Sequence, residues 1–478
     1  MSCSLLYPEG IAPAAPMDRR ILYHLSLDRA FSYISSDEKL TRRFFDVLLQ
    51  PCGRETVLYR QAILRDLQAD PQIFARLSSF AKVLRDISGD FHRASREVSM
   101  LRAGGAASLF SAQNLLQMQA KHLGDILRLL RSLDADLNSC RLRAEGLLAL
   151  HRHIQAITDS SAASALLPLC SRLELFESAD LKCRYRLDKA GRIVAFEVVE
   201  LEEEAALQKR PHRIRRKVTL PEGIPLQMTA ADAPKFDSMK ASALKEITQN
   251  LSVACRDLLD RFAHLGDELA FYAVALKYIR ALAQKGSACS YPTFGDGAHL
   301  EFTDLRDLYL LMTVSGAEHI VPSSLQLNDN RGVLLYGDNG SGKTVFLRSV
   351  STMQLLGQAG LPVPAERAQL SCVAALATQF SESEKGFLEA TAAGRFEQEV
   401  RELATMVDSL PAGSLVLLNE TFQSTAYTEG AEGLSHLLHW FSDHGIRWIL
   451  VTHLLQLDEY LKDLPVVRLH TSEGYRIS

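Results

Sequence analysis

The chain has 478 residues, of which 47% are hydrophobic, and its 53 basic and 57 acidic residues give a formal net charge of −4. This length and apolar content predict two to four domains with real hydrophobic cores. The charge balance excludes a global electrostatic footprint for nucleic acid, so any contact with DNA must be local.

No segment resembles a membrane span. Residues 1–16 are rich in small residues and proline, without the positive region and long apolar run of a secretory signal. The eight cysteines are scattered and include no C-x-x-C pair, which indicates reduced thiols and no zinc site. These features predict a cytoplasmic protein with no membrane partner.

Two segments carry apolar residues at mixed three- and four-residue steps, which predicts long helices able to pack along one another. The second, from about Ser238 to Ala283, would span on the order of 60 Å at about 1.5 Å per residue. Packing in the helical core is enough to explain the apolar residues of both segments. In the first segment they are Leu116, Leu123, Ile126, Leu130, Leu133 and Leu137. In the second they are Leu244, Ile247, Leu251, Cys255, Leu258, Phe262, Leu265, Leu269, Tyr272 and Leu276.

A β-hairpin and a basic cluster lie between these helices. Tyr185 to Val199 alternates and turns around Asp188-Lys189-Ala190-Gly191, and an acidic patch of Glu200 and Glu202–Glu204 follows. A basic cluster comes next, which either contacts nucleic-acid phosphates or is simply a run of charged residues exposed to solvent. The cluster's basic members are Lys209, Arg210, Arg213, Arg215, Arg216 and Lys217.

Residues 337–344 form a complete G-x-x-x-x-G-K-[ST] phosphate loop between the apolar run 332–336 and an amphipathic helix. Backbone N–H groups and a helix N-terminus then converge on one anion site, which predicts binding of ATP. Lys343 would reach the β- and γ-phosphates, and the Thr344 hydroxyl would coordinate Mg²⁺. The predicted nucleotide-binding residues are Gly337, Asp338, Asn339, Gly340, Ser341, Gly342, Lys343 and Thr344.

A second buried strand, Leu415–Leu418, ends in Asn419-Glu420, where an acidic pair usually binds Mg²⁺ and polarises water. Asn419 can accept a hydrogen bond from a metal-bound water but brings no charge, so Mg²⁺ should be held less firmly. Glu420 remains able to orient or deprotonate the attacking water. The pair predicts slow ATP hydrolysis.

A third strand, Ile446–Val451, runs into Thr452-His453 and places a histidine at the same edge of the sheet. His453 is predicted to sense the γ-phosphate, although a single histidine alone is more often structural. Residues 464–469 have the form of a last strand.

The segment from Gly332 to Leu457 resembles the ATPase domain of the MutS proteins, DNA mismatch-repair and related ATPases of the ABC class. The phosphate loop has Asn339 at the family's characteristic asparagine position. Beyond the loop, the similarity includes Gln358-Ala359-Gly360, Val363-Pro364-Ala365-Glu366, Asn419-Glu420, Thr425, Gly430 and Val451-Thr452-His453. The departures are Asn419 and the stretch Thr421–Thr425, which lacks the glycine and arginine of the repair enzymes. The resemblance therefore indicates a divergent branch of the family.

Residues 394–399 resemble the loop with which a family member reaches its partner subunit's nucleotide, except that Gly394-Arg395 replaces a serine-threonine pair. Arg395 could supply a cation to a γ-phosphate in trans, or it could be a solvated arginine at a helix start. The resemblance implies a homodimer that buries ATP between its subunits.

The resemblance also predicts the fold class, α plus α/β. Residues 1–178 would form a helical core and first lever, 179–222 a β-rich, clamp-like insertion, 223–288 a returning lever helix, and 289–478 an ABC-class P-loop ATPase domain. Leu25–Asp28 and Tyr59–Leu67 look like the family's opening helices. The family's mismatch-wedge and connector domains have no counterpart here, so direct mismatch recognition is not expected.

Three functions remain open. The favoured one is an ATP-dependent, dimeric clamp, related to DNA repair, that acts on double-stranded or branched DNA. The second is a mechanical ATPase that moves a protein partner, and the third is a switch in which ATP controls dimerisation with little hydrolysis. Salt-dependent DNA binding separates the first from the second, and turnover identifies the third.

Overall fold

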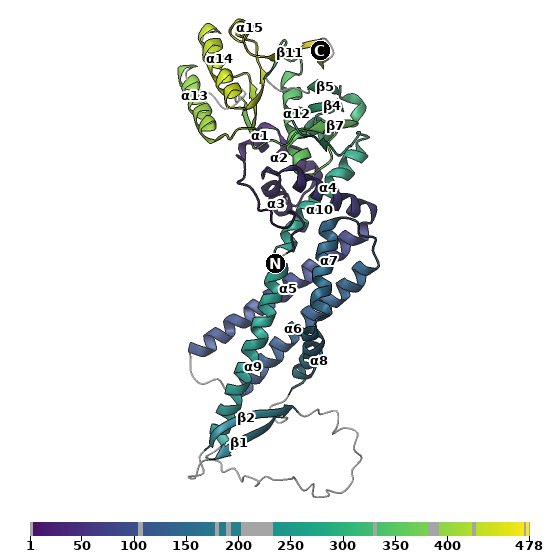
Figure 1. The fold of residues 1–478 in the computed structure, drawn as a ribbon, viewed down its shortest axis with the longest axis vertical. Coiled ribbons are helices and arrows are strands. Elements are labelled where there is room, and N and C mark those ends of the chain that lie inside the picture. Colours follow the sequence, from purple (N-terminus) through teal and green to yellow (C-terminus); the bar gives the residue numbers. More distant parts are fainter. Residues whose placement is uncertain are drawn as a thin grey trace. The chain divides into compact units, whose positions relative to one another are not determined.

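The structure is a computed structural model that describes residues 3–103, 109–176, 181–187, 193–201, 233–327, 332–380, 392–422, 427–472 and 475–477. The chain divides into two compact units, and both are visible in Figure 1. The first unit holds residues 1–3, 70–142 and 148–266. The second holds residues 4–69, 143–147 and 267–478. The predicted division into four domains stays a prediction.

The first unit is built around α6, which packs against α5, α8 and α9. The six apolar residues predicted to line its first long helix all lie on α6, and all six are buried, which confirms that stripe. Its helices are α5 (Pro71–Ala103), α6 (Leu109–Asn138), α7 (Glu145–Thr158, from residue 148), α8 (Ser161–Glu174) and α9 (Ala233–Phe262).

The second long helix is not continuous, contrary to the sequence-based expectation for residues 238–283. It is divided into α9, which ends at Phe262, and α10 (Leu265–Gln284). The two residues between them are Ala263 and His264, and Gly266, a poor helix former, follows in the first turn of α10. Acidic residues Asp267 and Glu268 in the first turn of α10 favour a new helix N-terminus there. Glu268 also accepts hydrogen bonds from Ser4 Oγ and Leu5 N.

The predicted hairpin is present as two antiparallel strands, β1 (Leu181–Leu187) and β2 (Ile193–Leu201). Tyr185 pairs with Phe196 in its register. Its use as a clamp stays a prediction. The basic cluster, with Lys209, Arg210, Arg213, Arg215, Arg216 and Lys217, lies outside the described residues.

The second unit contains a six-stranded sheet in the order β12-β11-β6-β10-β9-β8, in which all strands except β12 are parallel. The three strands expected around the phosphate loop and the expected last strand all belong to it. The strands are β6 (Gly332–Tyr336), β8 (Leu376–Phe380), β9 (Leu415–Asn419), β10 (Arg447–Val451), β11 (Val466–Ser472) and β12 (Arg476–Ile477).

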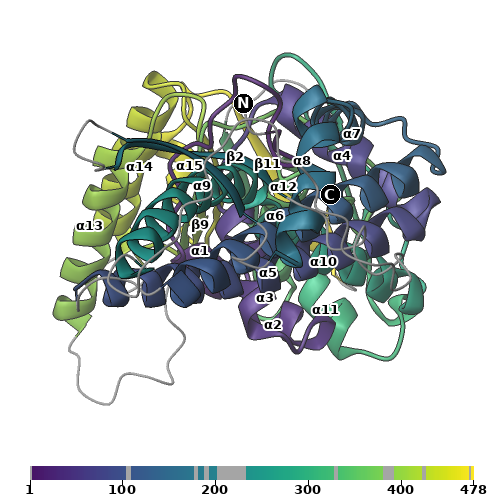
Figure 2. The same ribbon diagram turned by 90° about the horizontal axis from the view of Figure 1, so that it is seen from below.

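Helices cover this sheet. α13 (Ala392–Ser409) and α14 (Tyr427–Asp443) lie side by side in both Figure 1 and Figure 2. Their apolar residues share one core with alternate residues of β6, β9 and β10, including Leu334, Val416 and Leu450. α12 (Lys343–Gln358) packs against β9 and β10 as well and is buried along almost its whole length. This sheet and its helices confirm the mixed helical and α/β fold with a parallel sheet.

A four-stranded sheet that the sequence did not predict accompanies the first, in the order β3-β7-β4-β5. Phe302 of β4 contacts Phe346 of α12, with ring centroids 6.2 Å apart. Its strands are β3 (Thr293–Phe294), β4 (Leu300–Leu305), β5 (Ser323–Leu327) and β7 (Arg367–Leu370).

Further helices belong to the second unit. They are α1 (Arg20–His24), α2 (Leu27–Ile34), α3 (Glu38–Leu48), α4 (Arg54–Ala69), α11 (Leu308–Thr313), the 3-10 turn η3 (Ala317–His319) and α15 (Leu457–Tyr460). Across the part of the chain that the structure describes, no helix is long and apolar enough to cross a membrane.

Candidate functional site

The phosphate loop joins the fully buried strand β6 to α12. Gly340 and Gly342 have φ angles of 78° and 93°, in the left-handed region that favours glycine. A Cβ atom on Gly337 would lie 1.7 Å from Thr471 Oγ1, so a larger residue at that position would have to displace the Thr471 side chain. Asp338, Asn339 and Gly340 are exposed, and Gly337 and Ser341 are half-buried. An exposed loop at a helix N-terminus fits the binding of a phosphate chain.

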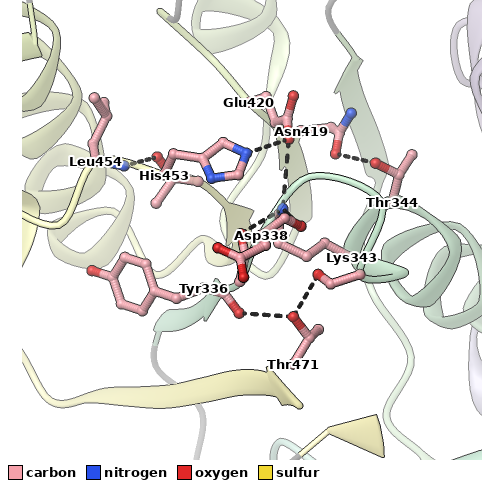
Figure 3. A network of polar contacts seen from close by, with 12 residues as sticks. Tyr336, Asp338, Lys343, Thr344, Asn419, Glu420, His453, Leu454 and Thr471 are labelled. Carbon is pink, nitrogen blue, oxygen red and sulfur yellow. Dashed lines mark hydrogen bonds and ion pairs between the residues drawn. The ribbon is translucent and has the colours of Figure 1, made fainter. Parts of the chain in front are cut away.

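Lys343, the first residue of α12, turns back over the loop (Figure 3). Its Nζ donates hydrogen bonds to the carbonyl oxygens of Gly337 and Asp338, at 2.7 and 2.8 Å, and lies 3.9 Å from Glu420 Oε1. Burial lowers the pKa of Lys343, while the charges of Glu420 and Asp338 act in the opposite direction. The cation is therefore held beside the loop, where phosphates would replace the carbonyl oxygens as its partners.

Thr344 and Asn419, the two predicted Mg²⁺ ligands, are in direct contact. Thr344 Oγ1 donates to Asn419 Oδ1 at 3.2 Å. Thr344 is exposed and Asn419 lies at the carboxyl end of β9, so a hydroxyl and an amide oxygen face the loop. Among the described residues, no group of three His, Cys, Asp or Glu side chains could hold a metal ion. The donors fit a Mg²⁺ ion held largely by nucleotide phosphates and water.

Glu420 and His453 meet above the loop, from the carboxyl ends of the neighbouring strands β9 and β10 (Figure 3). His453 Nε2 lies 3.1 Å from Glu420 Oε1. Both side chains are partly exposed, at 30% for His453 and 22% for Glu420. The backbone N–H of Glu420 donates to Val451 O at 2.8 Å, which ties the two strand ends together. A carboxylate, an imidazole and an ammonium group therefore share one edge of the sheet.

Thr471 supports the loop from β11, and it was not among the site residues predicted from the sequence. Its Oγ1 lies 2.6 Å from Ser341 Oγ and 3.4 Å from Tyr336 O. Tyr475, the residue before β12, lies against Gly342. Thr471 is 130 residues away from Ser341 in the chain, so no local sequence pattern links the two residues. The only signal for a close neighbour of the loop is the glycine at position 337, where a Cβ atom would meet Thr471.

Gly394 and Arg395 lie in the first turn of α13, and the side chain of Arg395 falls outside the described part of the structure. Their predicted contact with a second subunit's nucleotide therefore stays a prediction. The phosphate-loop residues, Asn419, Glu420 and His453 do come together in the second unit.

The class of fold follows from this geometry. A parallel sheet in which β6 leads through a glycine-rich loop into a buried helix, with polar groups at the neighbouring strand ends, is an α/β fold with a candidate anion site at the helix N-terminus.

Two family models match the chain. Residues 333–473 match MutS domain V, and residues 53–285 match the MutS2 N-terminal domain. The chain is a divergent MutS-like protein.

Curated proteins similar to this chain also carry MutS names. The DNA mismatch repair protein MutS of Synechococcus elongatus is 26% identical over 461 residues, which cover 91% of this chain and 51% of the relative. The DNA mismatch repair protein MutS 2 of Halobacterium salinarum is 32% identical over 218 residues, or 43% of this chain and 24% of the relative. The chain thus spans about half the length of the first relative and a quarter of the second.

Proposed function

We propose that the chain is a dimeric MutS-like ATPase that binds ATP and Mg²⁺ and acts on double-stranded or branched DNA. The observation that carries the ATPase part is the convergence of three groups on the phosphate loop. Lys343 Nζ lies 3.9 Å from the Glu420 carboxylate, which lies 3.1 Å from His453 Nε2. The names of the relatives, DNA mismatch repair proteins, support the DNA part.

In this proposal each residue has one task. Loop N–H groups and Lys343 bind the phosphates, and Thr344 and Asn419 orient the metal ion, which would neutralise charge on the phosphates. Glu420 accepts a proton from the attacking water, and His453 orients the Glu420 carboxylate and faces the γ-phosphate. No mismatch specificity is proposed, so a matched duplex and the same duplex with one mismatch should bind equally well.

A switch with little hydrolysis is the second candidate, and Asn419 favours it because a neutral amide replaces a carboxylate at the metal. We expect Asn419→Asp to lower the Mg²⁺ concentration for half-maximal turnover about tenfold, or ~1.4 kcal/mol. Thr344 Oγ1 can donate to the new carboxylate as it does to the amide. Turnover measured against Mg²⁺ at saturating ATP tests this, and an unchanged Mg²⁺ requirement would remove residue 419 from the metal site.

DNA binding is expected to depend on the basic cluster between residues 209 and 217. Changing Arg213, Arg215 and Arg216 to glutamine should weaken duplex binding and reduce the slope of log affinity against log salt by as much as ~2.7, because each phosphate contact releases counterions. Fluorescence anisotropy over a salt series measures both.

The matched control changes the exposed residues Arg29, Lys39 and Arg42 to glutamine, which removes the same charge from α2 and α3. Equal losses in the two triple variants would indicate a general charge effect. Absence of DNA binding by the unaltered chain would favour an ATPase that acts on a protein partner.

Dimerisation is expected to follow nucleotide state. If ATP is buried between two subunits, ATP must favour assembly by linkage. Glu420→Gln with ATP should therefore shift the chain to a compact dimer, and Arg395→Ala should weaken that shift. Arg401→Ala is the control, because Arg401 lies further along α13 in an exposed ion pair with Glu397. Sedimentation that gives the same mass with ATP, ADP and no nucleotide would exclude a shared site.

A further inference from the structure

The turn that follows β9 has an unusual backbone. Glu420 and Phe422 have φ angles of 56° and 64°, in the left-handed region, although neither is glycine. Residues other than glycine rarely adopt this backbone conformation, and it persists only where the surrounding structure imposes it. Because Glu420 is itself one of the two residues, whatever imposes the turn also sets the direction of its carboxylate.

Thr421, between these two residues, is fully buried and anchors the turn. Its Oγ1 donates to Gln379 Oε1, and the Gln379 side chain is buried as well, at 3% exposure. Gln379 lies on β8, which pairs directly with β9. The bond thus joins the carboxyl ends of two adjacent strands, immediately beside Glu420.

Two further contacts hold the residues on either side. The N–H of Glu420 donates to Val451 O at 2.8 Å, and the N–H of Phe422 donates to Glu399 Oε2 of α13 at 3.0 Å. The Phe422 ring is buried in the core shared by α13, α14 and the sheet. Of these contacts, the bond between Thr421 and Gln379 is the one made by two buried, uncharged side chains, and it can be removed without altering the backbone or the charge.

We propose that Thr421 and Gln379 are positioning residues, which keep the Glu420 carboxylate directed at Lys343 and His453. The inference rests on the ATPase function proposed above. Without this bond the turn is free to relax toward an ordinary backbone conformation, and the carboxylate leaves its place 3.1 Å from His453 Nε2. A displacement of about 1 Å is enough to cost roughly 100-fold in rate.

The experiment uses the full chain and five variants. Thr421→Val removes the hydroxyl at nearly constant volume, and Gln379→Met removes its acceptor. The double variant removes both, which restores stability because no buried polar group is left without a partner. Thr421→Ser keeps the hydroxyl. Ser414→Ala is the matched control, since it removes a buried hydroxyl that donates to Pro411 O at 2.6 Å, at the other end of β9.

Single-turnover hydrolysis and affinity for a fluorescent ATP analogue are measured for each. We expect Thr421→Val and Gln379→Met to slow hydrolysis by roughly 10- to 100-fold, with affinity changed less than about twofold. The double variant should melt near the unaltered protein yet stay as slow as either single variant, and Thr421→Ser should recover most of the rate. A double variant that regains both stability and rate would overturn the proposal, as would losses equal to those of Ser414→Ala.

A second readout does not need turnover. In histidine-labelled protein, the imidazole resonances of His453, assigned with His453→Gln, should move in Thr421→Val toward their positions in Glu420→Ala and stay in place in Ser414→Ala. Unmoved resonances in Thr421→Val would contradict the inference. If the unaltered chain lacks turnover, the proposed ATPase function fails, and the resonances still decide whether Thr421 positions Glu420.

Discussion

Replacement of Lys343 with alanine is expected to abolish ATP binding in the micromolar range while leaving the fold intact. Nζ is held over the phosphate loop by its hydrogen bonds to two loop carbonyl oxygens, and charge-assisted bonds to phosphate are strong. The loss should reach at least about 100-fold in affinity, or ~2.7 kcal/mol. The two carbonyl oxygens released belong to exposed or half-buried loop residues, so water can replace Nζ.

Isothermal titration calorimetry with ATP and Mg²⁺ measures this affinity. Lys277→Ala is the matched control, because Lys277 is a half-buried lysine of α10 whose Nζ donates to Ser35 Oγ, away from the loop. The control should bind ATP as the unaltered chain does. Retained micromolar affinity in Lys343→Ala would contradict the assignment of the phosphate site.

Glu420→Gln is expected to stop turnover while ATP binding is preserved. The amide keeps the size of the side chain and an oxygen near His453 Nε2, but it cannot take a proton from water. General-base catalysis contributes roughly 100- to 10,000-fold, so turnover should fall by at least about 100-fold.

Phosphate release measures this rate, and calorimetry on the same sample measures binding. Glu432→Gln, on the exposed side of α14, makes the same chemical change outside the site and should leave the rate unaltered. An unchanged rate in Glu420→Gln would remove Glu420 from the mechanism.

Local patterns predicted the strands that deliver the site, because each is short, apolar and followed at once by its functional residue. Leu415–Leu418 before Asn419-Glu420 and the run before His453 are fully buried or nearly so. In parallel strands, the carboxyl ends meet at one edge, so the meeting of Glu420 and His453 was implicit in the sequence.

Contacts between distant, uncharged residues were not predictable. Thr471 and Ser341 are 130 positions apart, and Thr421 and Gln379 are 42 apart, without a spacing that links them. The break between α9 and α10 was also missed, because apolar spacing continues through Phe262, Leu265 and Leu269, although Gly266 lies within this stretch. Such features depend on tertiary packing, which overrides local periodicity.

ATP turnover by the full chain, measured with and without duplex DNA and beside Lys343→Ala, tests the central claim most directly. The proposed function predicts hydrolysis that requires Mg²⁺, changes when DNA is added and is absent from Lys343→Ala. Phosphate release by the unaltered chain no faster than that by Lys343→Ala, with and without DNA, would contradict it.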